Sequence, residues 1–183
     1  MAATFEALYS AYSRMQVQKT WDSIMNAPIA LDDILFAEML WAALKALISA
    51  AAIMAVIFAL GISRAPTLLV ALLVLGLVGI TFASVALVFN ALAQGYDFFT
   101  SYFTLVITPM TFLSGVYFPI EHMPGWLQAV AQVLPLKAAV DLVRPLVLGT
   151  WPTEVLQPVA ILLAYAGGGY FLALVLTRRR FFR

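Results

Sequence analysis

The chain has 183 residues, of which 64% are hydrophobic and only 10% are charged, and its formal net charge is +1. A water-soluble domain of this size carries about 25% charged residues. This composition, with a mean hydropathy of +0.99, therefore excludes a soluble globular domain and indicates a membrane protein. The small net charge gives no reason to expect a nucleic-acid partner, and the absence of cysteine excludes disulfides and thiolate metal sites.

Residues 1–33 are predicted to form an amphipathic cytoplasmic segment. Apolar residues recur in it at helical spacing while polar residues fill the other face, and these apolar positions are Phe5, Leu8, Tyr9, Tyr12, Met15, Trp21, Ile24 and Met25. Pro28 ends the pattern. Asp32 or Asp33 can then cap the helix that enters the membrane.

Four segments are long and apolar enough to cross a bilayer core of about 30 Å, which takes roughly 20 residues in a helix. These spans are predicted near 38–62, 66–92, 98–119 and 154–177. Four spans put both termini on one side, where six basic residues lie: Arg14, Lys19, Arg178, Arg179, Arg180 and Arg183. Three lie on the other side: Arg64, Lys137 and Arg144. Because basic residues favour the cytoplasmic side, we expect both termini to be cytoplasmic.

Residues 120–152, between the third and fourth spans, are not a plain polar loop. Apolar residues at roughly helical spacing occur on both sides of Pro135: Trp126, Leu127, Val130 and Val133, then Val140, Leu142, Val143 and Leu146. We expect two short helices that dip into the membrane from outside. Such a re-entrant hairpin is tolerated where it packs against protein or lines a water-filled cavity.

A few charged residues lie in or near these apolar segments. Lys45 falls inside the first span, where it either extends to the interface or pairs with Glu38 or another helix. Asp141 and Arg144 are close enough on one helix to pair, and Lys137 lies on the same helix. These three charges either satisfy one another or contact an exported polar substrate. The arginines at 178–180 indicate topology and contact with anionic lipid.

No catalytic residue, metal site or cofactor is predicted in the chain. It has a single histidine, no Ser/His/Asp constellation and no G-x-x-x-x-G-K-[ST] motif for binding a nucleotide. Glu121 and His122 are adjacent and could act as an acid and a base near the outer surface. A membrane-embedded enzyme that uses this pair is therefore kept as an alternative.

The stretch from Ile107 to Arg144 resembles the signature of ABC type-2 exporter permeases. The residues that stand at the family's spacings are Ile107, Met110, Leu113, Ser114, Val116, Met123, Pro124, Pro135, Leu136 and Arg144. The Met-Pro and Pro-Leu pairs and the final arginine make the match specific. One position departs from the pattern, because Ala138 stands where the family usually has His, Arg, Ser or Tyr.

The resemblance implies that residues 1–183 form one transmembrane domain, the permease subunit of an ATP-driven exporter. Two permease copies, in a homodimer, would line the path through the bilayer, and separate ATPase subunits would bind ATP. Residues 18–33 look like the family's coupling segment, with ATPase-docking residues Trp21, Asp22, Ile24 and Met25. The resemblance places the substrate path or external hairpin at Lys45, Glu121, His122, Pro124, Pro135, Lys137, Asp141 and Arg144.

The phrase from Leu134 to Pro145 looks closest to the NodJ-type branch, which is associated with lipo-oligosaccharide export. Polysaccharide and drug exporters are its relatives, so the resemblance implies an amphipathic substrate and the bacterial inner membrane. The family normally has six spans, and the first residues here resemble the tail of its second span. The chain therefore looks like a permease without its first two helices, and a remnant that does not transport is a further alternative.

Overall fold

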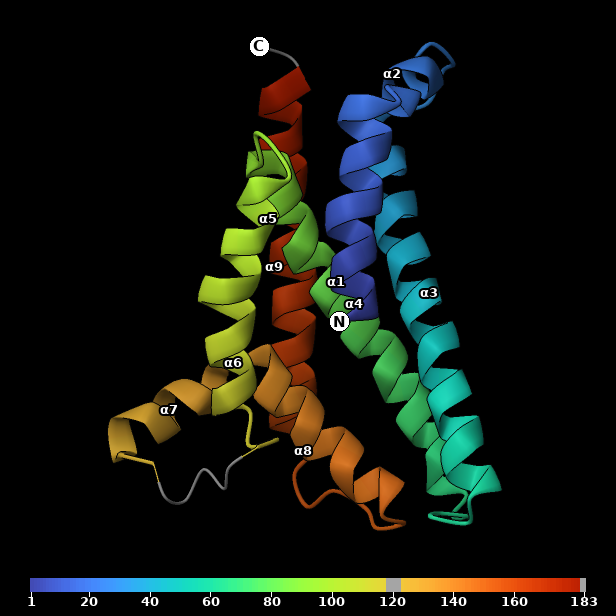
Figure 1. Cartoon of the computed structure of the whole chain (residues 1–183), viewed down its shortest axis with the longest axis vertical. Helices are drawn as coiled ribbons and strands as arrows, with labels where there is room; N and C mark the ends of the chain where they lie inside the picture. The colour runs from blue at the N-terminus through green and yellow to red at the C-terminus, as the bar shows by residue number, and fades with distance from the viewer. Residues whose placement is uncertain (118–122, 182–183) are drawn as a thin grey trace.

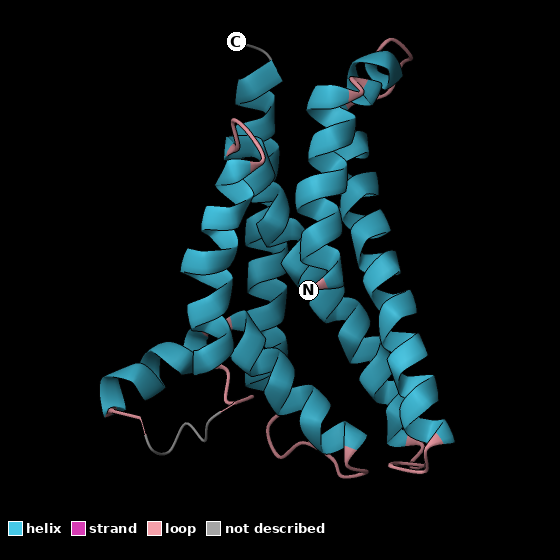
Figure 2. Cartoon of the chain, in the orientation of Figure 1, coloured by secondary structure: helices cyan, strands magenta, loops and turns pink. Residues whose placement is uncertain are grey.

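The computed structural model describes residues 1–117 and 123–181, and all regular secondary structure in these residues is helical (Figure 2). Three helices are long and apolar enough to cross a membrane: α3 (Leu31–Ala59), α4 (Thr67–Leu92) and α9 (Leu156–Phe181). They run along the long axis of the molecule (Figure 1). The all-helical membrane fold expected from composition is confirmed.

The remaining predicted span, 98–119, is a helix with an irregular middle. It consists of α5 (Asp97–Tyr102), a π-helical turn η3 (Phe103–Ile107) and α6 (Thr108–Leu113). Pro109 explains the irregularity, because its ring lacks an N–H and clashes with the carbonyl one turn earlier. The described helix ends at Leu113. Among the residues that the structure describes, three helices meet the length and hydropathy required of a span, and a fourth span stays a prediction.

The first 17 residues form a helix inside the bundle rather than a separate surface helix. It is built from α1 (Ala2–Phe5) and two π-helical turns, η1 (Glu6–Ser10) and η2 (Ser13–Val17). A stripe of small and apolar residues, Ala3, Ala7, Leu8 and Ala11, is buried against the core. These small side chains let the helix lie close to α3 and α4, which the hydrophobic pattern alone did not indicate.

Aromatic rings fill the space between this N-terminal helix and α5. The Tyr9 and Tyr12 rings meet the edge of Phe99 at centroid distances of 5.1 and 5.3 Å, and Phe5 stacks on Phe103 at 4.6 Å. Phe99 is completely buried. Edge-to-face and offset contacts of this kind add stability beyond the buried area, so they hold α5 against the bundle.

The α4 helix lies at the centre of the bundle and packs most closely against α9. Thr81 donates its hydroxyl to the Leu162 carbonyl at 3.1 Å. A Cβ atom added at Gly169 would lie 3.0 Å from Ser84 Oγ and 3.2 Å from the Val85 nitrogen. Lipid does not drive apolar helices together, so close backbone approach at small residues is what stabilises such an interface.

Residues 125–147 contain two short helices, α7 (Gly125–Val133) and α8 (Pro135–Val147), joined at the extended residue Leu134. α8 packs against α4 and α9, through the buried residues Ala138, Ala139, Leu142 and Leu146. α7 extends sideways from the bundle and exposes Trp126. Both helices lie at the end of the molecule opposite α2 (Thr20–Met25) and the C-terminus (Figure 1).

The close packing of α4 and α9 gives a stability prediction. We expect Gly169→Leu to lower the melting temperature of the detergent-purified protein or to prevent folding, because overpacking costs about 1–3 kcal/mol or more. Gly168→Leu is the matched control, since nothing lies within 4 Å of a Cβ at that position. Equal melting temperatures for the two variants would contradict this packing.

Candidate functional site

The carboxylate of Glu38 joins three separate segments of the chain. Glu38 lies in the first part of α3 and is only 9% exposed. It accepts hydrogen bonds from Arg14 Nε at 2.7 Å and Nη2 at 2.5 Å, and from Trp21 Nε1 at 3.1 Å. A bidentate arginine–carboxylate pair is among the strongest hydrogen-bonded arrangements in proteins, so Glu38 attaches both the N-terminal helix and α2 to α3.

A second buried carboxylate, Glu6, extends this arrangement deeper into the bundle. It accepts hydrogen bonds from Lys45 Nζ at 2.9 Å, Trp41 Nε1 at 3.1 Å and Ser10 Oγ at 2.9 Å. Arg14 also lies 3.3 Å from Glu6 and thus bridges both carboxylates. We call the six residues Glu6, Arg14, Trp21, Glu38, Trp41 and Lys45 the polar network. Its two acids and two bases balance, as apolar surroundings require.

The network settles which alternative applies to Lys45. The ion-pair partner of Lys45 is Glu6 on the N-terminal helix. It is not Glu38, which lies about two helical turns earlier on α3. The Lys45 ammonium also lies 5.3 Å from the centre of the Trp41 ring, a cation–π contact. Spacing within α3 could not reveal this partner, because Glu6 comes from 39 residues earlier in the chain.

The structure corrects the expected docking face of α2 at one residue. Trp21 is 1% exposed and its indole N–H is used by Glu38, so Trp21 does not belong to an exposed face. Asp22, Ser23 and Ile24 are exposed, and Met25 is partly buried against the core. Trp21 was predicted to lie on the docking face because its helical spacing matches that of Ile24 and Met25. Spacing alone cannot distinguish a face that packs against the same chain from one that binds a partner protein.

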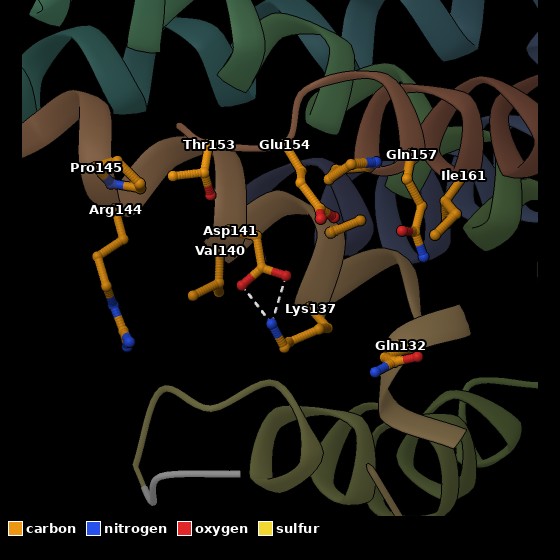
Figure 3. A pocket seen from close by; sticks show the side chains of 12 residues that line it. Gln132, Lys137, Val140, Asp141, Arg144, Pro145, Thr153, Glu154, Gln157 and Ile161 are labelled. Atoms are coloured by element: carbon orange, nitrogen blue, oxygen red, sulfur yellow. Dashed lines mark hydrogen bonds and ion pairs between the residues drawn. The ribbon is translucent and has the colours of Figure 1, made fainter. Parts of the chain in front are cut away.

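The second polar site is a cavity of about 570 Å³ at the opposite end of the molecule. It lies between α8 and the start of α9, and α7 contributes Gln132 (Figure 3). Its lining consists of Gln132, Lys137, Ala138, Val140, Asp141, Arg144, Pro145, Thr153, Glu154, Gln157, Pro158 and Ile161. The cavity therefore brings together three predicted hairpin residues, Lys137, Asp141 and Arg144, with residues that sequence reasoning missed.

Asp141 and Arg144, which their spacing would allow to pair, have different partners in the structure. Asp141 is paired with Lys137 one helical turn earlier, and Figure 3 shows Arg144 pointing away from this pair. Arg144 Nη2 instead donates to the Gly115 carbonyl at 2.8 Å. Both i,i+3 and i,i+4 spacings permit a pair on a helix, and the loop after α6 supplies Arg144 with a partner that the helix pattern does not show.

The other predicted hairpin residues have structural positions or lie outside the described residues. Pro124 precedes the first residue of α7, and Pro135 is the buried first residue of α8, where proline's missing N–H costs no helical bond. Glu121 and His122 fall among the residues that the structure does not describe. The missed residues Thr153, Glu154 and Gln157 are polar positions just before and within the start of an otherwise apolar helix, which was the available signal.

The arginines at the end of α9 bind protein groups as well as marking topology. Arg178 forms an ion pair with Asp32 in the first turn of α3. Arg180 donates to the carbonyls of Asn90 and Ala91 at 3.3 and 3.0 Å. These carbonyls lie at the C-terminal end of α4, where a cation adds a hydrogen-bond donor and complements the helix dipole. The sequence predicted a topology signal and contact with anionic lipid, and it did not indicate these contacts within the chain.

The polar network gives a second stability prediction. Glu38→Ala leaves Arg14 and Trp21 without their partner, and we expect a loss of about 3–5 kcal/mol in unfolding free energy. Trp21→Phe keeps an aromatic ring but removes the indole N–H that donates to Glu38. Its loss should cost about 1–3 kcal/mol in unfolding free energy. The exposed Asp22→Ala is the control, with an expected change within about 0.5 kcal/mol. Thermal unfolding in one detergent, monitored by tryptophan fluorescence or circular dichroism, measures these changes. Equal stability of all three variants and the parent would contradict the network.

Comparison with known proteins places the chain in a family. A family model described as ABC-2 type transporter matches residues 1–148. Nodulation protein J of Rhizobium leguminosarum bv. trifolii is 45% identical over 182 residues, which is 100% of this chain and 70% of that protein. Its namesakes in Rhizobium meliloti and Bradyrhizobium diazoefficiens are 42% and 41% identical, over 98% and 100% of this chain and 68% and 70% of their own lengths. No solved structure matches significantly. The chain thus belongs to the ABC-2 type transporter family, as a transmembrane transport subunit.

Proposed function

We propose that this chain is the permease of an exporter driven by separate ABC ATPase subunits, which bind and hydrolyse the ATP. Membership of the ABC-2 type family supports this assignment. The observation that carries the coupling mechanism is the attachment of α2 to α3 through Trp21 and Glu38. A force applied by an ATPase to α2 would pass through this hydrogen bond to a helix long enough to cross the membrane.

In this proposal α2 is the docking element for the ATPase. Its exposed residues Asp22, Ser23 and Ile24 offer a small mixed surface, and Trp21 fixes the helix from the buried side. Arg14 would carry the same displacement to the N-terminal helix, because it shares Glu38 with Trp21. Two helices at least would then move together when the ATPase engages α2.

The distribution of basic residues supports an orientation with α2 inside the cell. α2 and the C-terminal arginines lie at one end of the bundle, and α7 and α8 lie at the other (Figure 1). Basic residues are enriched on the cytoplasmic side of membrane proteins. We therefore assign the termini to the cytoplasm, the hairpin of α7 and α8 to the exit side, and the protein to the inner membrane of a bacterium.

The substrate proposed is a lipo-oligosaccharide, moved by two copies of this permease that together line the path. Similarity to proteins named nodulation protein J supports this branch of the family. A polysaccharide or an amphipathic drug is the alternative cargo. Reconstitution of the chain in liposomes with a candidate partner ABC ATPase tests the assignment. We expect ATP-dependent movement of a labelled lipo-oligosaccharide, and the absence of ATP-dependent movement of any of these three classes would overturn it.

The docking role of α2 can be tested separately. Ile24→Asp places a charge on the exposed apolar position of α2, and we expect at least a tenfold loss of ATPase association with an unchanged melting temperature. Ile62→Asp is the matched control, since Ile62 is exposed at the opposite end of α3. Co-purification and measurement of ATPase binding in nanodiscs distinguish the two. Equal binding by both variants would show that α2 is not the docking element.

A further inference from the structure

The cavity between α8 and the start of α9 contains several polar side chains that have no partner within the described part of the chain. Lys137 and Asp141 bind each other, and Arg144 binds the Gly115 carbonyl. Gln132, Glu154 and Gln157, by contrast, make no side-chain hydrogen bond to any residue that the structure describes. They come from α7, the loop before α9 and α9 itself, and Figure 3 shows them around the same hollow.

The chemistry of these three side chains matches hydroxyl groups. Each glutamine amide both donates and accepts hydrogen bonds, and a carboxylate accepts them strongly. Thr153 adds one more hydroxyl at the same wall. A sugar hydroxyl also donates and accepts, so one ring can satisfy several of these groups at once. The apolar lining of Ala138, Pro158 and Ile161 gives the C–H face of a ring a surface to pack on.

The charge balance of the cavity favours an uncharged ligand. Its lining has two cations, Lys137 and Arg144, and two carboxylates, Asp141 and Glu154, so that the formal sum is zero. Lys137 is neutralised by its ion pair with Asp141, and Arg144 already donates to the Gly115 carbonyl. The cavity volume of about 570 Å³ lies within the range of small-molecule sites, about 300–1,000 Å³.

We propose that this cavity binds the uncharged, hydroxyl-rich saccharide part of the exported molecule, with Gln132, Glu154 and Gln157 as its hydrogen-bonding residues. The assignment of the site to the exit side rests on the proposed export function. Its selectivity rests only on the lining. The charged residues of α8 then have a positioning role, because the Lys137–Asp141 pair and the Arg144–Gly115 contact fix the wall on which the saccharide lies.

The experiment measures binding of soluble saccharides to the purified chain in lipid nanodiscs, without ATPase or ATP. Cellotetraose is the neutral probe, a tetramer of glucosamine is the cationic probe and tetragalacturonate is the anionic probe. Ligand-observed saturation-transfer NMR and titration calorimetry report binding. We expect cellotetraose to bind at least tenfold more tightly than either charged tetramer, and Glu154→Gln and Gln157→Leu each to weaken it about tenfold.

Matched controls lie at the other end of the molecule. Gln94→Leu alters an exposed residue between α4 and α5, and Asp97→Asn alters the exposed first residue of α5. We expect both variants to bind cellotetraose like the parent. Gln132→Leu, on α7, serves as a further site variant if Glu154→Gln or Gln157→Leu lowers the melting temperature. The proposal is overturned if cellotetraose does not bind, if a charged tetramer binds more tightly, or if site and control variants bind equally.

The outcome is separable from that of the proposed function. Saccharide binding with failed ATP-dependent transport would count against the export assignment and leave the site intact. The double variant Glu154→Gln, Gln157→Leu provides the converse test. If it transports a lipo-oligosaccharide at the parent's rate and with the parent's half-saturating concentration, the site is wrong and the export assignment stays intact.

Discussion

The ionised carboxylate of Glu38 is the constraint on which the arrangement of the N-terminal half depends. An ion shielded from water must be paired and hydrogen-bonded, or the folded state is strongly destabilised. Arg14 and Trp21 meet this requirement from two different segments. The N-terminal helix and α2 therefore have one position relative to α3, and the polar network continues through Arg14 to Glu6 and Lys45.

A second set of contacts transmits this arrangement to the opposite end of the molecule. α3 packs on α4, where a Cβ at Gly79 would lie 3.3 Å from the Ala43 backbone. α4 in turn holds α8, since Thr67 donates to the Leu146 carbonyl at 2.6 Å. Close packing makes interiors poorly compressible, so displacements pass along such contacts as whole-helix movements. α2 and the cavity are thus mechanically connected through α3, α4 and α8.

The two ends of the molecule use their polar residues differently. At the α2 end, acids and bases neutralise one another and the two carboxylates are buried, which suits a rigid attachment. At the α8 end, Lys137 pairs with Asp141, but amide and carboxylate side chains around the cavity stay open to a ligand. A rigid attachment at one end and an open polar cavity at the other are what a protein needs in order to couple a force to a bound cargo.

Composition and local pattern are enough to establish the solvent and the broad class of this protein. A composition of 64% hydrophobic and 10% charged residues requires lipid, and three of the predicted spans correspond to α3, α4 and α9. The residues from Ile107 to Arg144 resemble the signature of the transporter family. This resemblance can be seen in the sequence because the prolines and turn residues of the signature follow one another along the chain. The short helices around Pro135 also follow from local pattern.

The partners of the polar groups, by contrast, follow from how the helices pack against one another. Lys45 pairs with Glu6, Asp141 pairs with Lys137, and Trp21 faces inward to Glu38. Gln132, Glu154 and Gln157 share a cavity although three elements carry them. Helical periodicity states which residues share a face of one helix. It does not state which other helix covers that face, because that depends on small-residue packing and charge pairing between segments distant in the sequence.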